Sequence, residues 1–83
     1  MKARISGAKN LKLGKNAILG EISLRKNISS VLKLGKDAIL MSGSFVYAGS
    51  KIGDNLMLGH NSIIREENVI GNNFKLWSNS VVD

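Results

Sequence analysis

Aliphatic residues recur at every sixth position through most of this 83-residue chain. The series has no gap and contains only Leu, Ile and Val. No helical or heptad period competes with it, so this repeat is the feature that most constrains the fold. Its members are Ile28, Leu34, Leu40, Val46, Ile52, Leu58, Ile64, Ile70, Leu76 and Val82.

A mostly small residue precedes each later aliphatic by two positions, and the residue before it is usually Gly, Asn or Asp. Residues two apart on a strand point to the same side, so the small residue and the aliphatic can both face inward. Gly, Asn and Asp tolerate positive φ angles, which favours a corner at the preceding position. The expected corner residues are Asp37, Gly43, Gly49, Asn55, Asn61, Glu67, Asn73 and Asn79.

Similar segments begin at Lys33, Lys51 and Val69, which gives a longer period of 18 residues. Three six-residue sides then form one triangular coil, and successive coils stack at the strand spacing of about 4.8 Å. The expected fold is all-β, a parallel β-helix with about 4.5 such coils. The expected inward columns are Leu34/Ile52/Ile70, Leu40/Leu58/Leu76, Val46/Ile64/Val82, Ala38/Leu56/Phe74 and Ser44/Ser62/Ser80.

The N-terminal copy of the repeat is out of step with the others. Residues 12–19 match residues 33–40 at seven of eight positions but lie 21 residues upstream, which is 18 plus three. We therefore expect one domain over residues 1–83, with first coils at 1–19 and a coil with a three-residue insertion at 20–33. Regular coils follow at 34–51, 52–69 and 70–83, the last incomplete. Residues 25–27 are the expected insertion; Ile5, Leu11, Leu13, Ala17 and Leu19 should face inward, and Asn10 and Asn16 should be corners.

The composition excludes several kinds of site. Without Cys there is no disulfide, thiolate metal site or Cys nucleophile, and a single His excludes sites that need two imidazoles from one chain. No apolar run has the length of a signal peptide or of a membrane span of about 20 residues. These features predict a cytoplasmic protein with no membrane span.

The positive charge is concentrated in the N-terminal part of the chain. Residues 1–36 hold nine bases and one acid (9 − 1 = +8), and residues 37–83 hold three bases and five acids (3 − 5 = −2). The 18-residue frame predicts outward columns of Lys12/Lys33/Lys51 and Lys15/Lys36. These columns either bind an anionic partner or form a solvated face that blocks edge pairing. Nucleic acid fits poorly, because the basic face carries no interleaved aromatic residues.

The motif aliphatic–Gly–x–Asn/Asp–small–x, most regular over residues 28–83, resembles that of the hexapeptide-repeat acyltransferases. The resemblance implies a left-handed parallel β-helix. This handedness comes from the resemblance alone, since parallel crossovers are otherwise nearly always right-handed. The resemblance further implies a homotrimer and transfer of an acyl group from coenzyme A to an acceptor.

Residues 59–66, Gly-His-Asn-Ser-Ile-Ile-Arg-Glu, resemble the segment that carries the general base in family members acting on sugars or nucleotide sugars. The resemblance implies that His60 takes a proton from a sugar hydroxyl or amine, with acetyl-CoA as cosubstrate. Asn61, Trp77 and Ser78 are the expected substrate contacts, no residue is assigned to coenzyme A, and no metal is implied. The alternative is a surface His60 without a catalytic task.

Other residues near this segment have two interpretations each. Ser42 and Ser78 align with His60 and either hydrogen-bond its imidazole or are ordinary polar corners, the second being favoured. Trp77 fits a subunit contact better than sugar stacking. Arg65 and Asp83, 18 apart, are expected to be close enough for an ion pair.

The acids that follow Arg65 are expected to be solvated corner residues. These acids are Glu66 and Glu67. In the alternative interpretation, one of them orients His60 of a neighbouring subunit across a trimer interface.

The length departs from the family pattern, because working members usually carry more coils. We therefore expect either a piece of a longer enzyme or an end covered by another copy. The alternative function is a non-catalytic structural module that associates through its open ends. Two other functions of this fold are excluded, since its zinc carbonic anhydrases need three His and its ice-binding helices need Thr, which this chain lacks.

Overall fold

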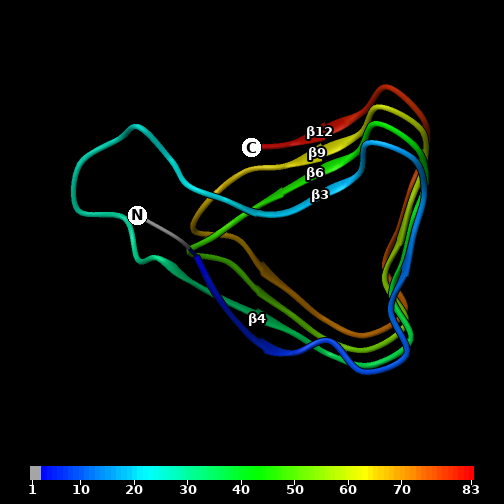
Figure 1. The fold of residues 1–83 in the computed structure, drawn as a ribbon, viewed down its shortest axis with the longest axis horizontal. Coiled ribbons are helices and arrows are strands. Elements are labelled where there is room, and N and C mark those ends of the chain that lie inside the picture. Colours follow the sequence, from blue (N-terminus) through cyan, green and yellow to red (C-terminus); the bar gives the residue numbers. More distant parts are fainter. Residues whose placement is uncertain (1–2) are drawn as a thin grey trace.

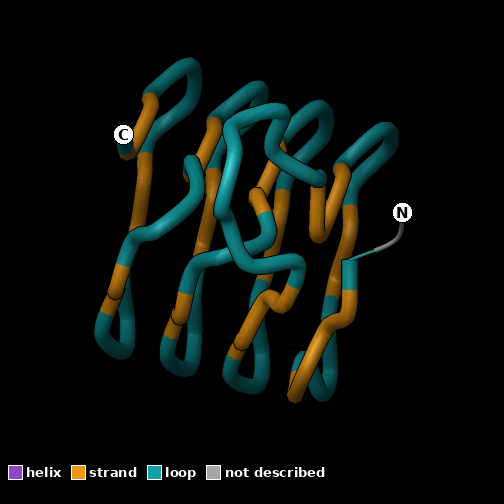
Figure 2. Tube along the Cα trace, turned by 90° about the vertical axis from the view of Figure 1, so that its left-hand side faces the viewer, coloured by secondary structure: helices purple, strands orange, loops and turns teal. Residues whose placement is uncertain are grey.

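The computed structural model describes residues 3–83, in which all regular structure is β. Short parallel strands form three sheets, and the chain visits the sheets in turn, so that the backbone traces a triangular outline (Figure 1). Figure 2 shows successive coils lying one on another along the stack. This arrangement is consistent with a parallel β-helix. Residues 3–83 contain no helix that is long and apolar enough to cross a membrane.

Each sheet contains four strands, one from each layer of the stack. Sheet A contains β1 (Arg4–Gly7), β4 (Val31–Leu34), β7 (Lys51–Ile52) and β10 (Val69–Ile70). Sheet B contains β2 (Lys12–Leu13), β5 (Ile39–Leu40), β8 (Met57–Leu58) and β11 (Lys75–Leu76). Sheet C contains β3 (Ile18–Glu21), β6 (Phe45–Tyr47), β9 (Ile63–Ile64) and β12 (Val81–Val82).

In the three layers formed by β4 to β12, paired residues are 18 positions apart, as the repeat predicts. Leu34 pairs with Ile52 and Ile52 with Ile70, and the corresponding aliphatics of sheets B and C pair in the same way. Most of these side chains lie in the dry core: Leu40 is 1% exposed, and Leu58 and Ile64 are 0% exposed. The predicted columns of aliphatics are therefore confirmed.

Corner positions adopt the left-handed backbone that the sequence indicates. All eight predicted corners have positive φ, including Glu67 at 64°, whose residue type does not favour this region. Asn10 and Asn16 also have positive φ, at 54° and 62°. The corner spacing along the chain is thus confirmed at both ends of the described segment.

The predicted three-residue insertion is wrong, because the first layer is offset by 27 residues. Lys12 pairs with Ile39 and Leu13 with Leu40, and β1 and β3 begin their pairings at the same offset. The excess over 18 is nine residues, and the surplus chain forms a loop between β3 and β4, over residues 22–30. Figure 1 shows this loop projecting outward from one corner of the triangle.

The larger insertion also changes which lysines are neighbours. Lys33 and Lys51 pair across β4 and β7 as expected, but Lys12 lies in sheet B. The main chain of Lys15 bonds to the Gly43 corner, so Lys15 is not aligned with Lys36. Both predicted lysine columns are therefore wrong in their first-layer member.

The first-layer residues predicted to face inward are covered on one side. Leu11, Ala17 and Leu19 pack against the core. Ile5 and Leu13 stack on Leu32 and Leu40 but remain 41% and 49% exposed. Among residues 3–83, no further layer lies beyond them, which explains their exposure.

Truncating a core column should be costly, whereas truncating an outward position should not. We expect Leu58→Ala to lower the free energy of unfolding by about 2–5 kcal/mol, because it leaves a cavity between Leu40 and Leu76. Val69→Ala, at a side chain 84% exposed, should change it by less than about 0.5 kcal/mol. Urea unfolding followed by far-ultraviolet circular dichroism measures both, and equal losses would contradict the assigned core.

Candidate functional site

His60 lies at the corner between β8 of sheet B and β9 of sheet C, where the chain must change direction. The next residue, Asn61, adopts a φ of 58° and completes the turn. Stacking fixes this corner from both sides: Asn61 N donates to Ser42 O at 3.0 Å, and His60 O accepts from Asn79 N at 2.8 Å. The main chain of His60 is thus held in place while its side chain is exposed.

Gly59 is required just before this corner because the next layer approaches too closely for a side chain. A Cβ at Gly59 would lie 2.4 Å from the main-chain nitrogen of Ser78 and 2.7 Å from the carbonyl carbon of Trp77. Ser62, on the other side of the corner, is fully buried, and its hydroxyl donates to Trp77 O at 2.6 Å. The layers around His60 are therefore locked together by contacts with the Trp77–Ser78 main chain.

The hydrogen bonds of residues 3–83 include none from a serine hydroxyl to the imidazole of His60, which agrees with the favoured interpretation of Ser42 and Ser78 as polar corner residues. The Ser78 hydroxyl accepts a hydrogen bond of 3.0 Å from the main-chain nitrogen of His60 instead. Ser42 contributes its carbonyl oxygen to the Asn61 amide. Within residues 3–83, the hydrogen bonds of His60 are made by its main chain, so the imidazole is available to a ligand.

Two hollows flank this corner on its sheet B side. A hollow of about 280 Å³ is lined by His60 together with Ser42, Met41, Gly14 and Lys12. A second hollow of about 280 Å³ is largely apolar and is lined by Met41, Met57, Gly59, Trp77 and Ser78. Met41 borders both hollows, so the hollow lined by His60 and the one lined by Trp77 and Ser78 are neighbours.

The predicted substrate contacts divide into two groups. Trp77 is 88% exposed and lies with Ser78 in the apolar hollow. Asn61 lines neither hollow; its side-chain oxygen lies against the Gly43 corner of the preceding layer, where a Cβ would collide with it. The structure therefore brings Trp77 and Ser78 beside the His60 region and leaves Asn61 at the outer edge of the corner.

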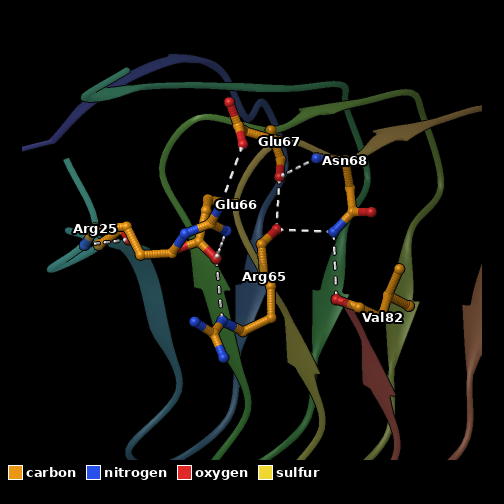
Figure 3. A network of polar contacts seen from close by, with 8 residues as sticks. Arg25, Arg65, Glu66, Glu67, Asn68 and Val82 are labelled. Carbon is orange, nitrogen blue, oxygen red and sulfur yellow. Dashed lines mark hydrogen bonds and ion pairs between the residues drawn. The ribbon is translucent and has the colours of Figure 1, made fainter. Parts of the chain in front are cut away.

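A second polar constellation lies at the corner between sheets C and A, where the 22–30 loop projects. Glu66 was expected to be a solvated acid, but its side chain is only 1% exposed. Its Oε1 accepts from Arg65 Nε at 3.2 Å and lies 3.5 Å from Arg25 Nη1 (Figure 3). The expectation of a solvated Glu66 is therefore wrong, and this residue is too deeply buried to reach a neighbouring subunit.

The Glu66 carboxylate is held in its charged form. The Ser23 hydroxyl, the residue's own main chain, and the guanidinium groups of Arg65 and Arg25 lower its pKa, and burial opposes them. The net effect is a pKa below the ordinary value of 4.5. Oε2 is buried without a group in hydrogen-bonding geometry, and both guanidinium groups lie beside Oε1.

Arg65 is fixed by several contacts at once. Its guanidinium lies 5.1 Å from the ring centroid of Tyr47, in cation–π geometry. Its carbonyl oxygen accepts from Ser50 Oγ at 2.7 Å and from Asn68 Nδ2 at 3.0 Å, and the same amide reaches Val82 O (Figure 3). Within residues 3–83 the ion pair of Arg65 is with Glu66, so the predicted pairing with Asp83 is wrong.

The 22–30 loop is attached to this corner by Arg25. Its guanidinium reaches Glu66 and also lies 3.9 Å from Glu67 Oε1. Sequence reasoning missed this contact because Arg25 was assigned to a short insertion. The sequence pattern does indicate that Glu66 faces inward, because it lies two residues after Ile64 and 18 residues after Ala48, and both of these are buried.

Comparisons of the sequence with models of known protein families and with curated proteins, and of the fold with solved structures, found no match.

Replacing Glu66 should change how stability depends on pH. We expect Glu66→Gln to lower the free energy of unfolding by ~3 kcal/mol at pH 7, because two guanidinium groups lose their buried partner. The folded-state pKa of Glu66 is depressed below 4.5. The charged carboxylate therefore contributes its full stabilisation above about pH 4.5, and this stabilisation is lost as the pH falls through the folded-state pKa. Urea titrations between pH 7 and pH 3 measure this effect. The difference in unfolding free energy between Glu66→Gln and the wild type should become smaller as the pH falls.

Glu67→Gln is the matched control, because the Glu67 side chain is 59% exposed and its ion pair within residues 3–83 is a long one of 3.9 Å with Arg25. We expect its unfolding free energy to follow that of the wild type within about 0.5 kcal/mol across the same pH range. A Glu66→Gln variant whose deficit stays constant down to pH 3 would show that the carboxylate charge is not what the arginines require.

Proposed function

We propose that this chain carries the acceptor-activating part of an acyl-CoA-dependent acyltransferase, with His60 as the general base. The proposed scaffold is a left-handed parallel β-helix of triangular 18-residue coils, assembled as a homotrimer in the cytoplasm. The observation that carries the proposal is an exposed imidazole on a rigid corner beside a hollow. The resemblance of residues 59–66 to the sugar-directed hexapeptide-repeat acyltransferases supports it.

In the proposed reaction, the imidazole nitrogen of His60 accepts the proton of a sugar or nucleotide-sugar hydroxyl or amine. The acceptor oxygen or nitrogen then attacks the thioester carbonyl of acetyl-CoA, and the carbon–sulfur bond breaks in the second half of the acyl transfer. The coenzyme A sulfur leaves as a thiolate, and the proton held on His60 can return to it. General-base catalysis of this kind contributes about 10²–10⁴-fold to a rate.

The main-chain contacts of the corner serve this role. A general base must reach the acceptor proton within hydrogen-bond distance, so a base on a mobile corner would lose catalytic efficiency. The bonds from Ser78, Asn79 and Ser42 restrict the backbone on either side of His60. Gly59 lets the Trp77–Ser78 main chain approach closely enough for these bonds to form.

Trp77 is proposed to contact a neighbouring subunit of the trimer. An indole that is 88% exposed next to Met41 and Met57 offers a large apolar area that association would bury. Such a contact would place a second subunit beside the His60 corner. The proposed acceptor site would then be completed by two chains.

The catalytic proposal is tested by thiol release from acetyl-CoA, measured with the full chain and a panel of hexoses, hexosamines and nucleotide sugars. We expect His60→Ala to lower kcat by about 10²–10⁴-fold, with little change in the KM for acetyl-CoA. Lys36→Ala, an exposed corner residue on another edge, should retain the wild-type rate.

Unchanged turnover in His60→Ala would contradict the role of His60. Absence of thiol release with every acceptor, together with association that rises with concentration, would favour the structural-module alternative.

A further inference from the structure

Three basic side chains gather on the outer side of sheet A, away from the His60 corner. Lys33 and Lys51 are direct cross-strand neighbours on β4 and β7, and Arg4 lies on β1 opposite Val31, two residues before Lys33. Adjacent strands are about 4.8 Å apart. Like charges directly opposite each other are destabilising, so this face would be stabilised by a bound anion.

No acid of the described residues neutralises this group. The ion pairs within residues 3–83 join Arg25 and Arg65 to Glu66 and Glu67 at a corner, and none includes Arg4, Lys33 or Lys51. All three basic side chains are exposed. They are therefore available to a ligand from solution.

The three residues border a hollow of about 350 Å³ whose lining contains no carboxylate. Ser29 and Gly49 also line it. The Ser29 hydroxyl accepts a hydrogen bond of 3.1 Å from the Val31 amide, which leaves its own proton free to donate. Gly49 has a φ of 96° and adds only main-chain atoms to the lining.

The basic area is compact rather than extended. Along the same column, the residue paired with Lys51 on β10 is Val69, which is uncharged and 84% exposed. On sheet A the positive charge therefore lies on β1, β4 and β7 and does not extend to β10. A ligand that matches it carries several negative charges within a short distance, whereas a long polyanion would extend beyond the basic residues.

We propose that this hollow binds a compact phosphate-bearing ligand of the diphosphate class. Arg4 offers a planar guanidinium that can bind two phosphate oxygens, and the two ammonium groups offer point charges at strand spacing. The Ser29 hydroxyl adds a neutral donor. The site lies on the side of the triangle opposite the corner between sheets B and C, and it shares no lining residue with the His60 hollow.

Isothermal titration of the full chain with inorganic pyrophosphate tests the site, and thermal unfolding in the same buffers provides a second measurement. We expect saturable binding that weakens with added salt, and a midpoint of unfolding that rises with pyrophosphate concentration. The double variant Lys33→Ala/Lys51→Ala should weaken binding at least tenfold. Lys15→Ala/Lys36→Ala removes the same charge elsewhere and should retain wild-type binding.

Lys33→Glu separates binding from folding. It replaces a repulsive cross-strand pair by an attractive one, so we expect it to fold with unchanged or slightly raised stability and to lose pyrophosphate binding. Equal weakening in both lysine double variants would overturn the proposal, because it would show a response to net charge alone. Binding of heparin without binding of pyrophosphate would also overturn it in favour of a long polyanion.

Discussion

The main-chain hydrogen bonds between successive layers determine the position of nearly everything else in this structure. They continue through the corners as well as the strands: Asn55 N donates to Lys36 O at 2.9 Å, and Asn73 N donates to Asp54 O at 2.7 Å. The register of each layer is therefore set by its hydrogen bonds to the neighbouring layer. The placement of His60 depends on the same bonds, because its carbonyl accepts from Asn79 and the next residue donates to Ser42.

The core and the corners could be predicted from the repeat, because the same local sequence rule applies in every six-residue unit. An aliphatic at every sixth position and a residue tolerant of positive φ three positions before it determine which side chains lie inside. The rule failed for the first layer because offsets of 21 and 27 both shift the six-residue frame by three. The sequence match of residues 12–19 to residues 33–40 favoured the shorter offset, whereas the structure stacks Leu13 on Leu40.

The Glu66 corner could not be predicted from local spacing alone. Alternation from Ile64 indicates an inward side chain, but burying a carboxylate is costly unless a cation accompanies it. One of its cations, Arg25, comes from the loop, whose length was misjudged. With a three-residue insertion, Arg25 is not expected to reach Glu66, and a solvated acid is then the more reasonable interpretation. The His60 corner was easier to locate, since its position follows from the regular layers alone.

The stacked fold separates the residues that maintain it from those that contact ligands. Inward columns and corners use main-chain bonds, aliphatic contacts and buried hydroxyls, as at Ser62. Outward positions contribute little to these contacts, so they can carry Lys33 and Lys51 despite their mutual repulsion, or an exposed Trp77. Because the triangle has three sides, a group on sheet A and a group at the opposite corner occupy separate surfaces of one rigid core. The proposed general base and the proposed anion site can therefore lie on the same scaffold without sharing a residue.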